Sequence, residues 1–270
     1  MKVAVLLTCH NRKLKTIECL RRFNNLENPL GWVFEVFLVD DGSTDGTKNS
    51  VLEQFPHTHV IEGTGELFWN RGMCLAWEKS REYDNFDGVI WLNDDTMLYE
   101  NALAMVQNIV SLHPESCVVA TIESAQNKGY LTYGGLKKGL LQISTTNELK
   151  TCDTFNGNFV FIPKCVSDKI GYLDPYYRHS VGDFDYSRRA TRAGIVSYVT
   201  PIIGSCERNS SEPNWNRGTL IQRFKKLYSP LGNNPLETFH TYKQESIFKA
   251  MFLFVYIHIR VLITFVFPKK

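Results

Sequence analysis

The chain has 270 residues, 43% of them hydrophobic and 21% charged, which is the composition of a globular protein and argues against disorder. At this length one large domain or two small ones are expected. The formal net charge of +2 lacks the concentrated basic character of a nucleic-acid-binding protein, so no nucleic-acid partner is expected. The seven cysteines are scattered and free of CxxC spacing, which indicates neither a disulfide framework nor a zinc site and favours reduced thiols in the cytosol.

The first 120 residues alternate short apolar runs with amphipathic stretches, a pattern typical of βαβ units on a parallel sheet. Apolar residues at helical spacing predict helices over Leu14–Phe23 and Ala102–Leu112. Polar clusters directly follow several of the predicted strands, and open α/β sheets bind ligands beyond the carboxyl ends of their strands. The predicted strands are Val3–Thr8, Phe34–Val39, His59–Glu62, Val89–Leu92 and Cys117–Ile122.

The pattern then loosens before the chain becomes helical. Over Thr121–Asn158 we expect excursions or short antiparallel strands. A strand at Phe155–Pro163, a helix at Asp183–Ala193 and a strand at Val196–Thr200 are predicted next. From about Arg217 the chain is predicted to be helical.

The C-terminal segment Ile247–Phe267 is dominated by apolar residues, but Lys249, His258 and Arg260 interrupt it. A membrane-spanning helix needs roughly 20 predominantly apolar residues, and an arginine in its middle costs at least about 2.5 kcal/mol. Because the basic segment Arg217–Lys226 precedes it, we expect a peripheral anchor on an anionic cytoplasmic leaflet. The alternative is a helix that packs on the rest of the chain or on a partner subunit.

Two acidic clusters follow predicted strands. Asp40 and Asp41 can accept hydrogen bonds from a base N–H or a ribose hydroxyl, although the same residues suit a capped turn with solvated side chains. Asn93, Asp94 and Asp95 form the second cluster. Adjacent carboxylates repel unless a cation or hydrogen bonds offset their charge, and ligand sets made only of oxygen suit Mg²⁺ or Mn²⁺. This cluster also has the composition of a turn.

A third acidic cluster lies at the start of the helix predicted from residue 183. Asp183 and Asp185 do not share a helix face, whereas Asp185 can pair with Arg188 or Arg189 three or four residues on. Asp183 is then left to act as a base. The alternative is a helix N-terminus that favours acids through its dipole, with the arginines on a solvated face.

In this order the clusters resemble motifs of the family 2 inverting glycosyltransferases of the GT-A fold, over roughly residues 1–200. Gly182-Asp183-Phe184-Asp185-Tyr186 also resembles a bacterial rhamnosyltransferase-like branch. The resemblance implies an α/β fold in which a Rossmann-like mixed sheet is flanked by helices and followed by a helical C-terminal extension. It implies a catalytic domain at 1–215, with a nucleotide-binding half at 1–120 and an acceptor-binding half at 121–215, and an extension at 216–270.

The resemblance also implies roles residue by residue. Asp183 matches the acid that takes the proton from the acceptor hydroxyl, and Asp95, with Asn93 in support, matches the metal motif. Nucleotide-sugar contacts are expected at Thr8, His10, Asn11, Arg12, Asp40, Asp41, Asn70, Gly72 and Asp94. Acceptor contacts are expected at Trp69, His179, Asp185 and Trp215.

Three positions depart from the family pattern. Asn93 stands where the first acid of the DXD motif is usual, and Gly182 stands where the glutamate of the ED motif often lies. In the region after the predicted base helix where the family has a histidine as a further metal ligand, the chain has Gly204–Glu207 and no clear counterpart of that histidine. These departures make metal coordination by the protein sparse.

The implied function is inverting transfer of a sugar from a dTDP- or UDP-sugar, with dTDP-rhamnose as one candidate, assisted by Mn²⁺ or Mg²⁺. The expected acceptor is a hydroxyl of a saccharide or of a lipid-linked molecule in cell-surface polysaccharide synthesis. The expected location is the cytoplasm, with a peripheral position on the cytoplasmic face of the inner membrane. The alternative is a nucleotide-sugar-binding or scaffolding protein with the same fold and little catalysis.

Overall fold

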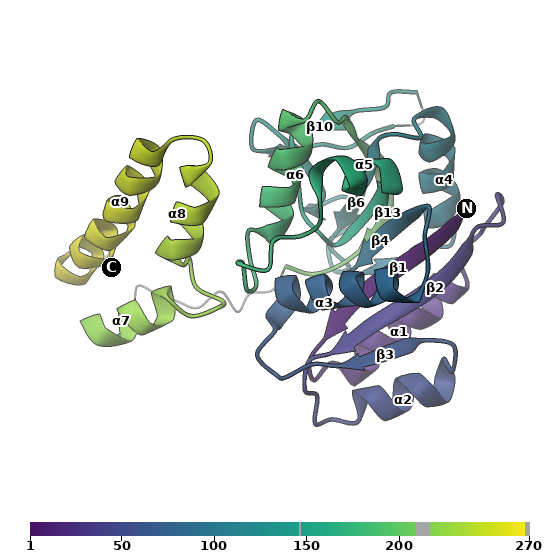
Figure 1. Cartoon of the computed structure of the whole chain (residues 1–270), viewed down its shortest axis with the longest axis horizontal. Coiled ribbons are helices and arrows are strands. Elements are labelled where there is room, and N and C mark those ends of the chain that lie inside the picture. Colours follow the sequence, from purple (N-terminus) through teal and green to yellow (C-terminus); the bar gives the residue numbers. More distant parts are fainter. Residues whose placement is uncertain (146, 209–216, 268–270) are drawn as a thin grey trace. The chain divides into compact units, whose positions relative to one another are not determined.

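The computed structural model in Figure 1 describes residues 1–145, 147–208 and 217–267. These residues form two compact units. The first consists of Met1–Pro175 and Gly182–Arg208. The second consists of Tyr176–Val181 and the described residues of the C-terminal region.

A mixed sheet forms the centre of the first unit (Figure 1). Strands β3, β2, β1 and β4 are parallel neighbours, β12 lies antiparallel between β4 and β6, and β13 is parallel to β6. A small second sheet has the order β11-β8-β9. The main strands are β1 (Lys2–Cys9), β2 (Val33–Asp40), β3 (His59–Glu62), β4 (Gly88–Leu92), β6 (Cys117–Glu123), β12 (Phe159–Pro163) and β13 (Ser197–Ser205). The short strands are β5 (Met97–Leu98), β7 (Leu131–Tyr133), β8 (Gly135–Lys137), β9 (Leu140–Leu141), β10 (Thr151–Cys152) and β11 (Thr154–Phe155).

Apolar cores cover both faces of the main sheet. Because side chains alternate along a strand, Val5 and Leu7 of β1 enter one core, whereas Ala4 and Leu6 enter the other. The first core is closed by α1 (Lys13–Asn24), α2 (Thr47–Gln54) and α4 (Ala102–Leu112). The second is closed by α3 (Phe68–Tyr83), α5 (Lys164–Ile170) and α6 (Gly182–Arg192).

The predicted fold class, an α/β mixed sheet flanked by helices, is confirmed, and each of the five strands predicted in the first 120 residues is present. The strand predicted at Val196–Thr200 continues to Ser205 as β13, because it also pairs with β5 and β6. The strand predicted at Phe155–Pro163 is wrong over residues 156–158, where the chain turns before β12 begins at Phe159. Gly157 is required in this turn, since a Cβ there would lie 2.5 Å from the Trp69 ring.

The second unit contains the helices α7 (Leu220–Leu227), α8 (Pro235–Lys243) and α9 (Ile247–Val266). The side chains of Thr219, Asn234 and Ser246 accept backbone N–H groups at the three helix N-termini, as expected for N-cap residues. Among the described residues, α9 alone is long and apolar enough to cross a membrane, with 20 residues, a mean hydropathy of 1.8 and only 11% of its most apolar window buried. The helical C-terminal extension that the sequence predicted is therefore present.

Candidate functional site

The loops that follow β1, β2, β3 and β4 share one edge of the sheet, because these four strands are parallel neighbours. Strand β12 runs in the opposite direction, so the residues that precede it reach the same edge. There the N–H of Asn93 donates to the carbonyl of Asn158 at 2.9 Å, and the N–H of Gly157 donates to Asp183 Oδ2 at 2.9 Å. All three acidic clusters therefore meet at this edge.

The loops after β1 and β2 are bonded to each other. The N–H of Asn11 donates to the Ser43 hydroxyl at 2.9 Å, and the Asn11 side chain accepts the N–H of Thr44 at 2.8 Å. Asn11 holds a left-handed backbone conformation with φ of 51°, which asparagine tolerates better than most residues. His10 is exposed and donates from Nδ1 to the carbonyl of Asp41 at 2.6 Å. The two loops thus form one wall of the candidate nucleotide site.

The carboxylates of Asp40 and Asp41 are buried and hold the surrounding loops. Asp40 Oδ1 accepts the N–H of Ser43 at 2.9 Å. Asp41 accepts three backbone N–H groups, those of Gly65 at 2.7 Å and Leu67 at 2.9 Å in the loop between β3 and α3, and that of Phe68, the first residue of α3, at 2.9 Å. The structure therefore gives both predicted nucleoside-contacting acids a clear structural role, to which any nucleoside contact is additional.

Each side chain of the predicted metal motif, Asn93, Asp94 and Asp95, is bonded to another residue. Asn93 Oδ1 accepts the indole N–H of Trp69 at 2.6 Å. Arg12 Nη1 lies 3.1 Å from Asp94 Oδ1 and 2.8 Å from Asp95 Oδ2, and so bridges the two carboxylates. Asp94 also accepts the Thr16 hydroxyl at 3.3 Å. Burial raises the pKa of Asp94 to about 7, against the opposing effect of the Arg12 charge.

Cys206 is a site residue that the sequence did not single out. It follows β13, in the region where no histidine was found, and its Sγ lies 3.5 Å from Asp95 Oδ1. The side chain is buried, and this burial raises the pKa of the thiol. Its position directly after a strand that ends at the ligand-binding edge is the signal that could have identified it.

Asp183 lies in the first turn of α6 and is positioned by two backbone donors. Gly157 N–H reaches Oδ2 at 2.9 Å, and Phe184 N–H reaches Oδ1 at 2.8 Å. Burial nevertheless raises the pKa of Asp183 to about 6, because these hydrogen bonds only partly offset the loss of solvation. A raised pKa near neutrality suits a carboxylate that must accept a proton.

Trp69 connects the predicted metal motif to the predicted base. Its indole N–H is bonded to Asn93, and its ring packs so tightly on Gly157 that a Cβ there would come within 2.5 Å of it. Gly157 in turn bonds to Asp183. A single partly buried aromatic side chain therefore lies between these two acidic motifs.

Two glycines are explained by close packing. A Cβ on Gly182 would lie 1.8 Å from Asn70 Oδ1, and the Asn70 side chain is fixed by its bond to the carbonyl of Asp174 at 2.8 Å. A side chain at position 182 would therefore collide with Asn70 in this packing. A Cβ on Gly72 would lie 2.3 Å from the Thr8 hydroxyl, so Gly72 allows α3 to approach the end of β1. Asn70, Gly72 and Thr8 are buried, with their roles in ligand binding still predictions.

The predicted acceptor residues are distributed over different parts of the structure. Asp185 is buried and paired with Arg189 at 2.8 Å, which confirms the pairing expected from their spacing. His179 is half-buried in the segment of the second unit that precedes α6. Trp215 lies outside the described residues. Among the described residues, the contacts of Trp69 reach Asn93 of the second acidic cluster and Gly157, which is bonded to Asp183 of the third.

The residues at this edge fit an open divalent-metal site better than a closed one. Within the described residues, no group of three or more His, Cys, Asp and Glu side chains is arranged to hold a metal ion. The carboxylates of Asp94 and Asp95 do converge on one cationic group, the guanidinium of Arg12. Mg²⁺ commonly uses one or two carboxylates and completes its shell with water and substrate phosphates, and these two carboxylates suit that arrangement.

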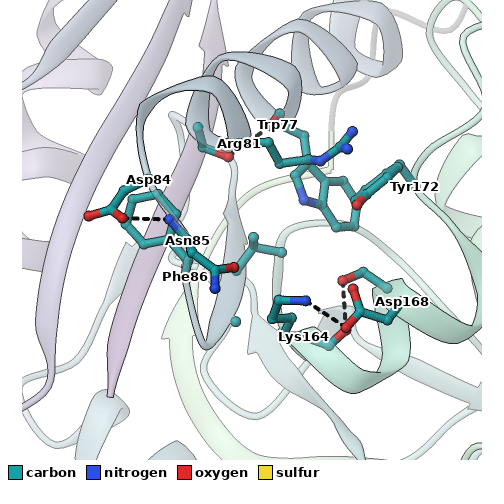
Figure 2. Close-up of a pocket in the computed structure, with 12 residues that line it drawn as sticks. Trp77, Arg81, Asp84, Asn85, Phe86, Lys164, Asp168 and Tyr172 are labelled. Atoms are coloured by element: carbon teal, nitrogen blue, oxygen red, sulfur yellow. Dashed lines mark hydrogen bonds and ion pairs between the residues drawn. The ribbon is translucent and has the colours of Figure 1, made fainter.

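A cavity of about 300 Å³ lies at the opposite edge of the sheet, beside the start of β4 and the beginning of α5. Figure 2 shows Arg81 next to Tyr172, with its guanidinium carbon 4.0 Å from the ring centre, and the ion pair of Lys164 with Asp168. None of the predicted site residues lines this cavity. It is therefore separate from the candidate active site.

The fold is that of the glycosyltransferases of the GT-A type, a class that uses nucleotide-sugar donors. The family model for glycosyl transferase family 2 matches residues 4–166, and the chain belongs to that family. A comparison with curated proteins finds no match.

Solved structures with the same fold include S. aureus TarS, with a TM-score of 0.59 and 14% identity over 85% of this chain and 40% of TarS. The TarS 1–349 fragment in complex with UDP has a TM-score of 0.58 and 15% identity over 85% of this chain and 66% of the fragment. The mannosyltransferase PcManGT from Pyrobaculum calidifontis, in complex with GDP-Man and Mn²⁺, has a TM-score of 0.55 and 18% identity over 99% of this chain and 76% of its own. At these identities the similarity concerns the fold, and the chain spans less than half the length of full TarS.

Proposed function

We propose that the chain is an inverting, metal-assisted glycosyltransferase in which Asp183 is the general base and the loops around Arg12 and Asp95 hold the nucleotide diphosphate of the donor. The observation that carries this proposal is the position of Trp69, which is hydrogen-bonded to Asn93 on one side and packs on Gly157, the residue that holds Asp183, on the other. A sugar lying against this ring would have its diphosphate toward the metal motif and its reacting carbon toward the base.

In this mechanism Asp183 takes the proton of the acceptor hydroxyl as that oxygen attacks the anomeric carbon from the side opposite the leaving diphosphate. The two backbone N–H groups on Asp183 fix the direction of its carboxylate. A pKa of about 6 leaves Asp183 ionised at neutral pH and basic enough to share the proton in the transition state. Inversion follows from this single displacement.

Asp95, with Asp94 beside it, would hold Mn²⁺ or Mg²⁺ together with oxygens of the donor. When bound, such an ion neutralises charge on the departing nucleoside diphosphate. The chain contributes two further groups, because Arg12 brings a positive charge to the same point and Asn93 fixes Trp69. The fold relative PcManGT, which was solved with GDP-Man and Mn²⁺, supports a divalent ion in this class of site.

For the donor we propose a UDP- or dTDP-sugar, with dTDP-rhamnose as a candidate, and for the acceptor a saccharide or lipid-linked hydroxyl in cell-surface polysaccharide synthesis. The TarS fragment with UDP and the one with UDP-GlcNAc support a uridine nucleotide. The proposal assigns donor binding to residues 1–120 and acceptor binding to residues 121–215. His179, Asp185 and Trp215 remain predicted acceptor contacts.

A thermal-shift panel of UDP-, dTDP- and GDP-sugars, each with and without Mn²⁺, tests the donor proposal. A ligand that binds the folded state at 100 times its Kd stabilises it by about 2.7 kcal/mol, so the cognate donor should raise the melting temperature by several degrees. The Asp95→Asn variant should lose the Mn²⁺-dependent part of this shift. The absence of a shift with every nucleotide sugar would contradict the proposal.

A second candidate is a nucleotide-sugar-binding or scaffolding protein with little catalysis. The engagement of Asn93 by Trp69 and of both carboxylates by Arg12 favours it, because these contacts leave few protein oxygens for a metal. The two candidates differ in one measurement. A catalytic protein releases nucleoside diphosphate from its cognate donor when an acceptor is added, whereas a scaffold binds the same donor and releases none.

We also propose that residues 216–270 attach the protein to the cytoplasmic face of the membrane. Large apolar side chains on α9 are exposed, with Phe248 at 81% and Phe252 at 68%. In the test, wild type and the double variant Phe248→Glu/Phe252→Glu are sedimented with vesicles that contain anionic lipid, and the double variant should lose binding. Leu14→Glu is the matched control, since Leu14 is also 81% exposed but lies on α1. Equal binding by all three proteins would refute the proposal and favour packing on a partner.

A further inference from the structure

Arg12 places a fixed positive charge between the two carboxylates of the metal motif. Its Nη1 atom alone makes both contacts, at 2.8 Å to Asp95 Oδ2 and 3.1 Å to Asp94 Oδ1. The side chain of Arg12 is 35% exposed, whereas those of Asp94 and Asp95 are only 6% and 8% exposed. The carboxylates are therefore enclosed, whereas the guanidinium is partly open to solvent.

The position that Arg12 occupies is also the position at which a divalent ion would have to bind. An ion bound to Asp95 Oδ2 would share this oxygen with Nη1, and two cations in contact with one oxygen repel each other strongly where solvent screening is reduced. The other oxygen of Asp95 faces the thiol of Cys206 at 3.5 Å. Both oxygens of Asp95 are thus engaged by side chains of the protein.

The rest of the guanidinium is suited to a different partner. In the part of the chain that the structure describes, the side-chain bonds of Arg12 all come from Nη1, so the Nε and Nη2 donors have no protein acceptor there. Arginine binds phosphate oxygens with a pair of parallel N–H donors, which a lysine cannot reproduce. A diphosphate at this edge could therefore draw Arg12 away from the acids.

We propose that Arg12 competes with the metal for Asp94 and Asp95 and so prevents a divalent ion from binding there without nucleotide. When the nucleotide enters, Arg12 moves to its diphosphate. The metal and the sugar donor therefore bind together. This inference rests on the proposed function for the identity of the nucleotide. The competition itself concerns only this chain and the ion. The competition predicts that the divalent ion and the nucleotide each bind weakly alone and tightly together.

The test measures Mn²⁺ binding by the full chain, from the electron paramagnetic resonance signal of free Mn²⁺, without nucleotide. Arg12→Gln should bind Mn²⁺ about tenfold more tightly than wild type, because the competing charge is gone. Lys13→Gln is the matched control: it removes the same charge from the neighbouring residue, whose Nζ lies near Gly46, and should stay within about twofold of wild type. Arg12→Lys keeps the positive charge but lacks the planar guanidinium, so its Mn²⁺ affinity should rise by only about twofold to fivefold.

Equal Mn²⁺ affinity of Arg12→Gln and wild type would overturn the proposal, as would an equal gain in Lys13→Gln, which would indicate a simple effect of net charge. If circular dichroism shows that Arg12→Gln does not fold, Arg12→Lys decides, and the absence of any gain in that variant overturns the proposal.

A parallel titration with UDP separates this inference from the proposed function. Wild type should gain about tenfold or more in Mn²⁺ affinity when UDP is present, and Arg12→Gln should gain less, since its ion no longer needs the nucleotide to displace a competitor. An equal gain in both proteins would overturn the displacement of Arg12 by the diphosphate. Failure of UDP, and of dTDP and GDP titrated in the same way, to change Mn²⁺ binding in either protein would count against the proposed donor site, whereas the comparison without nucleotide still tests the competition.

Discussion

Replacement of Asp183 by asparagine removes the proposed base and changes little else. Asparagine has the same shape, and its side-chain oxygen can still accept the N–H of either Gly157 or Phe184. In the wild type these two groups lie 2.9 Å and 2.8 Å from the carboxylate oxygens. A general base contributes about 10²–10⁴-fold to a rate, so kcat should fall by that factor. The affinity for the donor should stay within about twofold, because the base contacts the acceptor and not the nucleotide.

The pKa of Asp183 sets the pH dependence of the wild type. Burial raises this pKa from 3.8 to about 6, so the carboxylate is about nine-tenths ionised at pH 7 and about one-tenth ionised at pH 5. The rate of transfer should therefore fall about tenfold between pH 7 and pH 5, and the rate of Asp183→Asn should lack this dependence on pH.

The same shift predicts how the variant affects stability. The folded state binds the proton of Asp183 more readily than the unfolded state, so this group lowers the stability as pH rises from about 4 to 6, by about 3 kcal/mol. Asparagine carries no charge to bury, and this gain offsets the hydrogen bond that is lost where its amide nitrogen faces the N–H of Gly157 or Phe184, so the melting temperature of Asp183→Asn at pH 7.5 should change little. This measurement separates a lost base from a lost fold. The assignment is refuted if the wild-type rate is flat between pH 5 and 7, or if the folded variant keeps more than about a tenth of the activity.

Three further substitutions test the structure of the site. Gly182→Ala places a Cβ 1.8 Å from Asn70 Oδ1 and should destabilise the fold by about 1–3 kcal/mol in thermal unfolding; an unchanged melting temperature would contradict the packing explanation of this glycine. In Asp41→Asn, an amide nitrogen replaces one oxygen that accepts backbone N–H groups, so the melting temperature should fall by roughly 5–10 °C. If the variant instead lost nucleotide-sugar binding without losing stability, Asp41 would be an acid that only contacts the ligand. Trp69→Phe loses the bond to Asn93 and should raise the donor Kd about tenfold, whereas Trp77→Phe, in the core, should lower stability and leave the donor Kd unchanged.

Features set by local pattern and strand direction could be predicted from the sequence. The apolar runs locate the strands, and parallel strands bring their carboxyl ends to one edge, so the convergence of the loops at Arg12, Asp41 and Asp95 follows from the order of motifs. Pairing of Asp185 with Arg189 follows from helical spacing alone.

Features that depend on long-range packing could not be predicted in the same way. The bridge of Arg12 to Asp94 and Asp95 joins residues more than 80 positions apart, and the contact of Cys206 with Asp95 spans 111 positions. No local pattern encodes such a pair, because it depends on which loops meet once the sheet has formed. The membership of His179 in the second unit has the same origin, since the neighbouring Tyr177 is buried there against Thr241 at 3.0 Å.

The most direct test of the account is calorimetric titration of UDP, dTDP and GDP into wild type, Asp95→Asn and Asp183→Asn, each with and without Mn²⁺. If the edge that carries Arg12 and Asp95 holds the donor and Asp183 serves only the acceptor, one nucleotide binds wild type and Asp183→Asn alike, and Mn²⁺ strengthens its binding at least about tenfold in both. Asp95→Asn should lose this strengthening. Nucleotide binding that is independent of Mn²⁺ and unaffected by Asp95→Asn would contradict the central claim.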